Sequence, residues 1–335
     1  MTDELLQVTD LRTDFRIGGR QTPVVRGVTF SVRPGETVGL VGESGSGKSV
    51  TALSIVGLLP DPPARIAGGS VLLEGEELVG RPEKFLRSVR GARIAMVFQD
   101  PFSSLNPTMT LGEQIAEPIR LHKGLGRSAA KQEVLRLLHA VRIPSPETRF
   151  RQYPHEVSGG QRQRVMIAIA FACNPALLIA DEPTTALDVT VQAQVLGLMA
   201  DLQKSTGTGI LLITHDFGVV AQVCDRVLVM YAGQIVESGT TEQIFRAPRH
   251  PYTQGLLASL PRADAKKTDR LPSMSGQAPS VTQLPPGCPF YERCPHAMPQ
   301  ICPTREPESF ETEPGHTVRC YLYDPSVNLP LKKEA

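Results

Sequence analysis

Residues 42–49 read Gly42-Glu43-Ser44-Gly45-Ser46-Gly47-Lys48-Ser49 and fit the pattern G-x-x-x-x-G-K-S/T. The apolar run Thr37–Gly42 before them predicts a buried strand, and Ser49–Leu59 after them predicts a helix. In this context the glycines let backbone N–H groups curl around phosphates, and the helix N-terminus adds the positive end of its dipole. We therefore expect a phosphate-binding loop. The alternative is a glycine-rich turn without a ligand, which the flanking segments and the Lys-Ser pair disfavour.

The side chains of this loop have separate expected roles. Lys48 is expected to reach the β- and γ-phosphates, and the Ser49 hydroxyl is expected to bind Mg²⁺. The motif alone indicates a nucleoside triphosphatase without saying which one. The expected nucleotide ligands are Gly42, Ser44, Gly45, Ser46, Gly47, Lys48, Ser49 and Val50.

A pair of acids follows a second apolar run, Leu177–Asp181, with Glu182 directly after it. Ligands of open α/β sheets bind at the carboxyl ends of the strands. We therefore expect Asp181 in the Mg²⁺ shell and Glu182 as the general base on the attacking water. An Asp-Glu pair before a proline is otherwise typical of a solvated helix start, but the apolar run and the upstream loop argue against that reading.

A histidine closes a third apolar run, Ile210–His215. A lone histidine at a strand end is commonly a hydrogen-bonded structural residue. On a strand next to the acidic pair, however, His215 is placed to contact a γ-phosphate, and we favour that role.

The remaining pattern predicts an α/β fold. Ile94–Gln99 is another short apolar run, and Val189–Lys204 is helix-like. Strands that alternate with helices imply a parallel sheet covered on both faces. Val227–Tyr231 and Gln234–Glu237, separated by Ala-Gly, predict a hairpin near the end of this unit.

Composition and charge argue against some classes of function. The 335 residues carry 35 basic and 34 acidic side chains, a formal net charge of +1, and 41% are hydrophobic. This balance argues against nucleic-acid binding, which needs a basic field. No segment approaches the about 18 consecutive apolar residues of a membrane span, and the acidic N-terminus lacks the features of a signal peptide. We therefore expect a cytosolic chain whose work at a membrane requires a partner.

The composition shifts near residue 248. Fifteen of the 29 prolines lie between Pro248 and Pro330. So short a proline-rich segment buries little core without a covalent or metal staple. The same region holds four cysteines, Cys288, Cys294, Cys302 and Cys320.

The stretch Val157–Arg164 reads VSGGQRQR. Ser158 is placed to cap a helix whose first turn carries two glycines, which exposes N–H groups as an anion site with no lysine of its own. Such a site makes sense if it serves the ATP of another subunit; a flexible loop before an amphipathic helix is the alternative. The stretch resembles the LSGGQ signature of ABC ATPases, with Val157 in place of leucine.

The other ABC motifs follow in order. Gln99 resembles the Q-loop glutamine, Thr184–Asp188 the D-loop region, and His215 the switch histidine. The resemblance covers roughly residues 5–245 and implies an ATPase whose P-loop NTPase (RecA-like) core carries an antiparallel β subdomain and a helical subdomain at about residues 100–160. We expect an ABC ATPase domain over residues 1–247 and a small Cys/Pro-rich C-terminal extension over 248–335.

The resemblance also implies a dimer of two such domains that sandwich two ATP molecules head to tail. In that arrangement Gln99 would join the Mg²⁺ shell and take part in catalysis with Glu182 and His215. Phe15 would be the aromatic residue that stacks on adenine. The signature residues that would contact the partner's ATP are Ser158, Gly159, Gly160 and Gln161.

Three further stretches resemble the dipeptide, oligopeptide and nickel importer ATPases. They are Phe98–Pro107 (FQDPFSSLNP), Tyr153–Glu156 (YPHE) and Arg249–Thr253 (RHPYT). The resemblance implies peptide import at the cytoplasmic side of a bacterial inner membrane. The expected partners are a related but distinct ATPase chain, two permease subunits and an extracytoplasmic peptide-binding protein.

The alternatives within and beyond this branch are a nickel or glutathione importer and a non-transport ABC ATPase. DNA-repair relatives insert a long coiled coil or a zinc module between the phosphate loop and the signature. Here 108 residues separate Ser49 from Ser158 without a long heptad run, which disfavours that class.

The four C-terminal cysteines have the spacing C-x5-C-x7-C-x17-C, with proline after each of the first three. No C-x2-C pair, common in structural zinc sites, is present. Irregular spacing suits a 4Fe–4S cluster, which is larger than one ion, and the importer branch often carries such a cysteine set. We therefore expect a structural 4Fe–4S cluster; zinc, a labile disulfide and free thiols are the alternatives. Cys173 and Cys224 are expected to be core residues.

Overall fold

The computed structural model describes residues 4–185, 187–260, 274 and 276–327. The strands are β1 (Leu6–Ile17), β2 (Arg20–Val32), β3 (Thr37–Val41), β4 (Ala64–Leu73), β5 (Glu76–Glu77), β6 (Ile94–Val97), β7 (Leu177–Asp181), β8 (Gly209–Thr214), β9 (Arg226–Tyr231), β10 (Gln234–Thr240), β11 (Phe310–Glu313) and β12 (His316–Val318). The α-helices are α1 (Lys48–Ile55), α2 (Glu83–Val89), α3 (Pro101–Ser104), α4 (Leu111–Lys123), α5 (Arg127–Ala140), α6 (Pro146–Phe150), α7 (Gly159–Ala170), α8 (Val189–Thr206), α9 (Phe217–Val223), α10 (Thr241–Arg246) and α11 (Pro251–Ala258). Short 3-10 turns lie at Pro154–Glu156, Tyr291–Arg293 and Tyr321–Tyr323.

The central sheet has eight strands in the order β11-β12-β10-β9-β3-β8-β7-β6. Its middle strands β9, β3, β8, β7 and β6 run parallel. β3, β7 and β8 are buried along their whole length, which explains why their sequences are apolar throughout instead of alternating. The predicted parallel α/β core is therefore confirmed.

Alternate residues of these strands feed two hydrophobic cores, because successive side chains point to opposite faces of a sheet. Leu178 and Leu212 pack into the core formed with the helices α4, α5, α7 and α8. Leu177 and Leu211 pack into the core shared with α1 and the N-terminal strands. The sheet thus separates a helical layer from a β layer.

The β layer is the antiparallel sheet β2-β1-β4-β5, which the resemblance implied. Gly18 and Gly19 join β1 to β2, with φ angles of 57° and 81°. Two consecutive residues in the left-handed region give a tight hairpin turn whose twist matches the strands, and glycine adopts it without steric cost.

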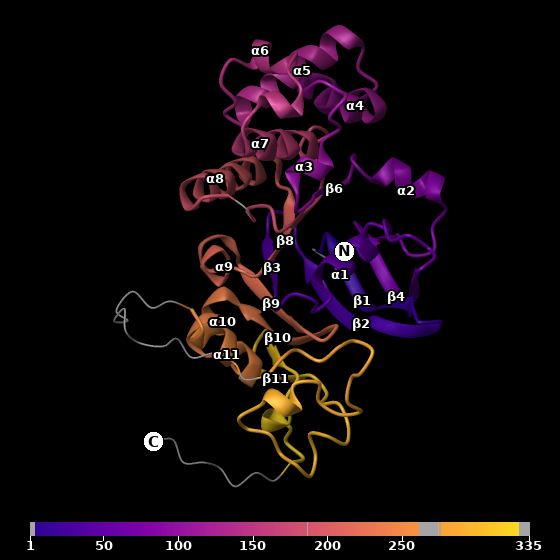
Figure 1. Cartoon of the computed structure of the whole chain (residues 1–335), viewed down its shortest axis with the longest axis vertical. Helices are drawn as coiled ribbons and strands as arrows, with labels where there is room; N and C mark the ends of the chain where they lie inside the picture. Colours follow the sequence, from indigo (N-terminus) through magenta and orange to yellow (C-terminus); the bar gives the residue numbers. More distant parts are fainter. Residues whose placement is uncertain (1–3, 186, 261–273, 275, 328–335) are drawn as a thin grey trace.

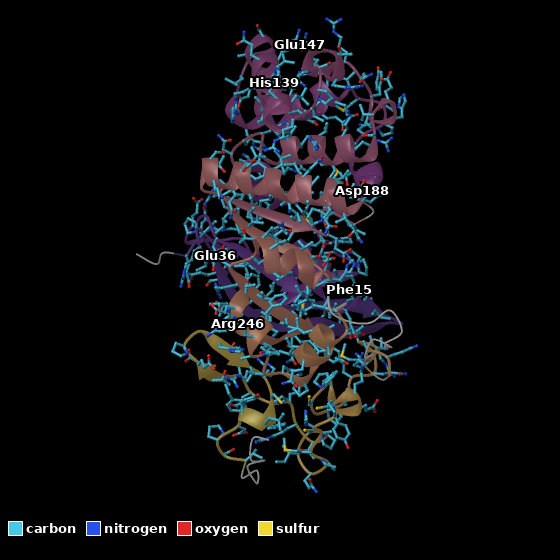
Figure 2. All side chains as sticks on the ribbon, turned by 90° about the vertical axis from the view of Figure 1, so that its left-hand side faces the viewer. Phe15, Glu36, His139, Glu147, Asp188 and Arg246 are labelled. Atoms are coloured by element: carbon cyan, nitrogen blue, oxygen red, sulfur yellow. The ribbon has the colours of Figure 1, made fainter. Side chains whose placement is uncertain are left out.

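The helices α4 to α6 pack against one another. Figure 1 shows this group at one end of the molecule and the yellow C-terminal segment that includes β11 at the other. In the turned view, the labelled side chains of His139 and Glu147 mark the helical end, and Arg246 lies toward the opposite end (Figure 2).

The C-terminal segment is built into the central sheet, because β12 pairs with β10 and β11 extends the sheet by one more strand. The fully buried Glu237 of β10 bonds residues of the C-terminal segment where it meets the sheet. Its carboxylate accepts the backbone N–H groups of Arg249 and His250 at 2.6 and 2.9 Å and lies 2.8 Å from Nε2 of His316. A buried carboxylate is stabilised only when it is paired in this way.

Among the described residues, no helix is both long enough and apolar enough to cross a bilayer.

Candidate active site

The phosphate loop leaves the end of β3 and enters α1 at Lys48. Gly42 has a φ of 154°, and a Cβ there would lie 2.2 Å from the Met230 carbonyl oxygen, so only glycine fits. Ser44 and Gly45 are exposed, and Val50 is half-buried. The Ser46 hydroxyl is buried and meets no hydrogen-bond partner among the described residues. A buried hydroxyl of this kind suits a loop that closes around an anionic ligand.

Lys48 lies inside the loop. Its Nζ donates hydrogen bonds to the carbonyl oxygens of Gly42 and Glu43 at 2.8 and 3.0 Å. Burial lowers the pKa of Lys48, and the nearby carboxylates of Glu182 and Asp181 offset part of this shift. An ammonium group among carbonyls and carboxylates is positioned to turn toward phosphate oxygens.

Ser49 and Asp181 meet at the expected Mg²⁺ position. The Ser49 hydroxyl donates to Oδ1 of Asp181 over 3.1 Å, although the two residues lie on α1 and β7. Burial raises the pKa of Asp181, and the hydrogen bond from Ser49 opposes this shift. A hydroxyl beside a carboxylate is an oxygen donor set that a hard cation such as Mg²⁺ prefers, so these residues fit the ion.

Glu182 is the centre of the expected catalytic group. Its carboxylate accepts hydrogen bonds from Gln99 Nε2 at 2.9 Å and from the Thr185 hydroxyl at 2.9 Å. Nδ1 of His215 lies 3.2 Å from its other oxygen. The structure thus brings together the three side chains that the sequence predicted for catalysis, Gln99, Glu182 and His215.

Two further features of Glu182 are its ionisation and its backbone conformation. Burial raises the pKa of its carboxyl group, but the hydrogen bonds from His215 and Thr185 outweigh this effect, and the net shift is downward. The carboxylate is therefore charged at neutral pH. Its backbone has a φ of 48°, a conformation that is uncommon for residues other than glycine and frequent at functional sites.

The signature residues lie on α7, where Ser158 is the N-cap. Its hydroxyl accepts the N–H of Gln161 at 3.4 Å, and the Gln161 side chain accepts the N–H of Ser158 at 3.2 Å. Gly159 and Gly160 begin the helix, as predicted. Throughout the described part of the chain, no hydrogen bond or ion pair joins these residues to residues 42–49.

Phe15 is half-buried on β1, where it pairs with Thr22 and Ala64. Figure 2 shows its side chain well away from that of Asp188 at the start of α8. Thr13, two residues earlier, links β1 to the phosphate-loop helix through a 2.8 Å contact with the Ser54 hydroxyl. The stacking role of Phe15 stays a prediction.

The four C-terminal cysteines are all described. Burial raises the pKa of Cys288 to about 11 and that of Cys320 to about 12, and the charges of neighbouring thiols add to both shifts. Cys302 Sγ accepts the N–H of Met298 at 3.3 Å. Among the residues in the described ranges, no three His, Cys, Asp or Glu side chains come close enough to hold a metal ion. The described residues thus give no support to the expected four-cysteine ligand set, which stays a prediction. Of the other two cysteines, Cys224 is buried and Cys173 is half-buried.

Two contacts at the site were missed by sequence reasoning. Thr185 lies in the stretch that resembles the D-loop, but nothing in that stretch indicates that its hydroxyl bonds Glu182. The second is an ion pair between Glu43 of the phosphate loop and Arg293, which are 250 residues apart. A pair so distant in sequence leaves no local pattern.

Two family models match separate parts of the chain. Residues 25–185 match the ABC transporter family model, and residues 236–302 match the model of the oligopeptide/dipeptide transporter C-terminal region.

Curated relatives match along nearly the whole chain. A probable peptide ABC transporter ATP-binding protein of Sinorhizobium fredii is 50% identical over 98% of this chain and 97% of its own length. The oligopeptide transport ATP-binding protein OppD of Bacillus subtilis is 52% identical over 96% of this chain and 90% of its own, and that of Salmonella typhimurium is 50% identical over 95% and 93%.

Solved structures share the fold. The dimeric MJ0796, described as a bacterial ABC transporter cassette, superposes with a TM-score of 0.63 at 25% identity and covers 70% of this chain and 98% of its own. The cbiO1 subunit of Clostridium perfringens gives a TM-score of 0.62 at 26% identity, over 73% of this chain and 92% of its own. The chain belongs to the ATP-binding, ATP-hydrolysing subunits of ABC transporters, in the oligopeptide and dipeptide transport family.

Proposed function

We propose that this chain hydrolyses ATP to drive the import of dipeptides or oligopeptides. The observation that carries the proposal is the convergence of Gln99, Thr185 and His215 on the Glu182 carboxylate, beside the Ser49–Asp181 pair. The peptide assignment is supported by relatives that are 50% and 52% identical and whose names specify peptide transport.

Each residue then has one task. Lys48 exchanges the Gly42 and Glu43 carbonyls for the β- and γ-phosphates of ATP. Ser49, Asp181 and Gln99 would hold Mg²⁺, which supplies charge neutralisation at the phosphates. Glu182 accepts a proton from the attacking water, and His215, hydrogen-bonded to Glu182, reaches the γ-phosphate.

In this proposal each ATP site is completed by residues of the other ATPase chain. Ser158 to Gln161 would present their N–H groups to the ATP held by a related but distinct ATPase chain. Phe15 would stack on the adenine of the ATP held by this chain. The ATPase domain occupies residues 1–247 and the C-terminal extension residues 248–335. Two permease subunits and an extracytoplasmic peptide-binding protein complete the transporter, which places this chain at the cytoplasmic side of the inner membrane.

The identity of the cargo is tested by measuring how the loaded binding protein stimulates ATP hydrolysis. The assembled transporter is reconstituted in lipid vesicles, and the ATPase rate is measured with the binding protein empty, loaded with a peptide, or offered a nickel complex or glutathione. We expect the peptide-loaded protein to raise the rate above that of the empty one. Stimulation by nickel or glutathione alone would replace the peptide assignment with the corresponding importer of the same branch.

We also propose that Cys288, Cys294, Cys302 and Cys320 hold a 4Fe–4S cluster that staples the extension. Burial raises the pKa of Cys288 and Cys320, and binding to a metal is one way to hold these two thiols as thiolates. The N–H···S bond to Cys302 is of the kind that tunes Fe–S ligands.

The cluster proposal predicts a brown protein with about four iron atoms per chain after anaerobic purification. Iron analysis and the visible absorption spectrum check this, with Cys173→Ser as the control variant that keeps the iron and Cys302→Ser as the variant that loses it. A colourless protein with one zinc ion or no metal would overturn the cluster and leave the ATPase assignment intact.

A further inference from the structure

The phosphate loop is held from outside by the C-terminal extension. Nη1 and Nη2 of Arg293 each donate to one oxygen of the Glu43 carboxylate, both at 2.8 Å. The Arg293 side chain is only 6% exposed, against 28% for Glu43. A two-pronged, largely buried pair of this kind has fixed geometry and is stronger than an exposed ion pair.

The backbone of Glu43 is held by the same region. Its N–H donates to the hydroxyl of Tyr252 on α11 at 2.8 Å, and its carbonyl accepts Lys48 Nζ at 3.0 Å. One loop residue therefore connects the extension directly to the lysine that is assigned to the phosphates.

Aromatic packing keeps Arg293 in place. Its Nη1 also donates to the Tyr231 hydroxyl at 3.2 Å, and its guanidinium lies 5.7 Å from the ring centre of Phe290. The rings of Tyr231 and Tyr252 are 4.5 Å apart, and Phe290 contacts both. A buried side chain locked by packing is what precise positioning of a neighbour requires.

The Arg293–Glu43 pair also neutralises a negative charge in the phosphate loop. Glu43 places a negative charge within the loop that must accept a polyphosphate, and a like charge at a binding site opposes the anion. Arg293 cancels this charge without occupying the phosphate position, since it approaches from the extension. The extension also makes a separate ion pair, between Arg249 and Glu313 near the β10–β12 junction.

We propose that Arg293 is a positioning residue for ATP binding: it neutralises Glu43 and fixes it, so that the C-terminal extension forms the outer support of the phosphate site. The proposal rests on the assignment of residues 42–49 to the ATP phosphates. It gives the extension a part in nucleotide binding, in addition to any role of its cysteines.

The test compares steady-state kinetics of the assembled transporter with ATP as the varied substrate. Arg293→Gln leaves Glu43 unpaired, and we expect the KM for ATP to rise on the order of tenfold, while kcat stays within about twofold. Arg293→Lys keeps the charge and should restore most of the affinity. The control Arg249→Gln removes the Arg249–Glu313 ion pair of the extension, which does not touch the phosphate loop, and should leave KM unchanged.

The double variant Glu43→Gln/Arg293→Gln decides between neutralisation and packing. We expect its KM to return to within about threefold of the wild-type value, because the uncompensated charge is gone. A folded Arg293→Gln variant with unchanged KM would overturn the proposal, and so would a double variant as weak as the single one. If Arg293→Gln does not fold, the double variant alone decides, and a KM raised on the order of tenfold in it would overturn the proposal.

The variant Lys48→Ala distinguishes a failure of this proposal from a failure of the assignment of residues 42–49 to the ATP phosphates. Loss of ATP binding in Lys48→Ala together with normal KM in Arg293→Gln would reject the role of Arg293 alone. Normal ATP binding in Lys48→Ala would instead reject the assignment of the loop.

Discussion

Glu182→Gln is expected to lower ATP turnover of the assembled transporter by ~10²–10⁴, the usual cost of losing a general base. The amide keeps the shape of the carboxylate and its contacts with Gln99 and His215, but it does not accept a proton. ATP affinity should stay near the wild-type value. One unhydrolysed ATP then keeps the sandwich of two ATPase domains closed, so the ATP-bound dimer should accumulate.

Phosphate release measures the turnover, and size-exclusion chromatography with bound-nucleotide analysis measures the closed state. Glu242→Gln on α10 is the matched control, because its partner Arg246 is exposed and both lie outside the site. Hydrolysis by Glu182→Gln at near the wild-type rate would mean that Glu182 is not the base.

Ser158→Arg is expected to abolish hydrolysis at the partner's ATP while ATP still binds at Lys48 of this chain. The N-terminus of α7 would face the partner, and a bulky cation there blocks closure on the γ-phosphate. The change also removes an N-cap, which costs about 0.5–2 kcal/mol of stability. Thr110→Ala removes the cap of α4 and serves as the control for that loss.

Combination with a disabled phosphate loop separates the two sites. When Lys48→Ala silences this chain's own site, Ser158→Arg should remove the hydrolysis that remains. When the partner's loop lysine is replaced by alanine instead, Ser158→Arg should cause no further loss. Remaining activity that is insensitive to Ser158→Arg in the first pairing would show that the sites do not act in trans.

The core strands were predictable because they are buried on both faces and apolar throughout. Leu177–Asp181 was predicted with the bounds that the structure has. The first helix ends at Ile55 instead of Leu59, because Gly57 adopts a φ of 64° and stops it. Helix ends of this kind depend on single backbone angles, which a periodic pattern does not encode.

The hairpin of β11 and β12 was not predicted. β11 reads Phe-Glu-Thr-Glu and is nowhere fully buried, so it carries no apolar run. It is a strand because β12 pairs with it and β12 also pairs with β10 through Glu237. Tertiary pairing, and not local preference, defines this element.

The candidate site was predictable as a set of residues but not as a network. The apolar run before Asp181, together with the phosphate loop upstream, was enough to place Asp181 and Glu182 at a strand end. The bonds that Thr185 and Arg293 make depend on how loops fold back onto the sheet. Such contacts become visible only in three dimensions.

The central claim is that ATP hydrolysis at Glu182 drives peptide import, and ATP-dependent transport of a peptide across a vesicle membrane tests it most directly. The complete transporter is reconstituted in vesicles so that this chain faces the outside solution. The peptide-binding protein and a labelled peptide are enclosed in the vesicles. The peptide released to the outside is measured with and without external ATP. The account predicts ATP-dependent movement of the peptide with the wild-type chain and none with Glu182→Gln. Equal movement with the two chains, or movement that does not depend on ATP, would contradict it.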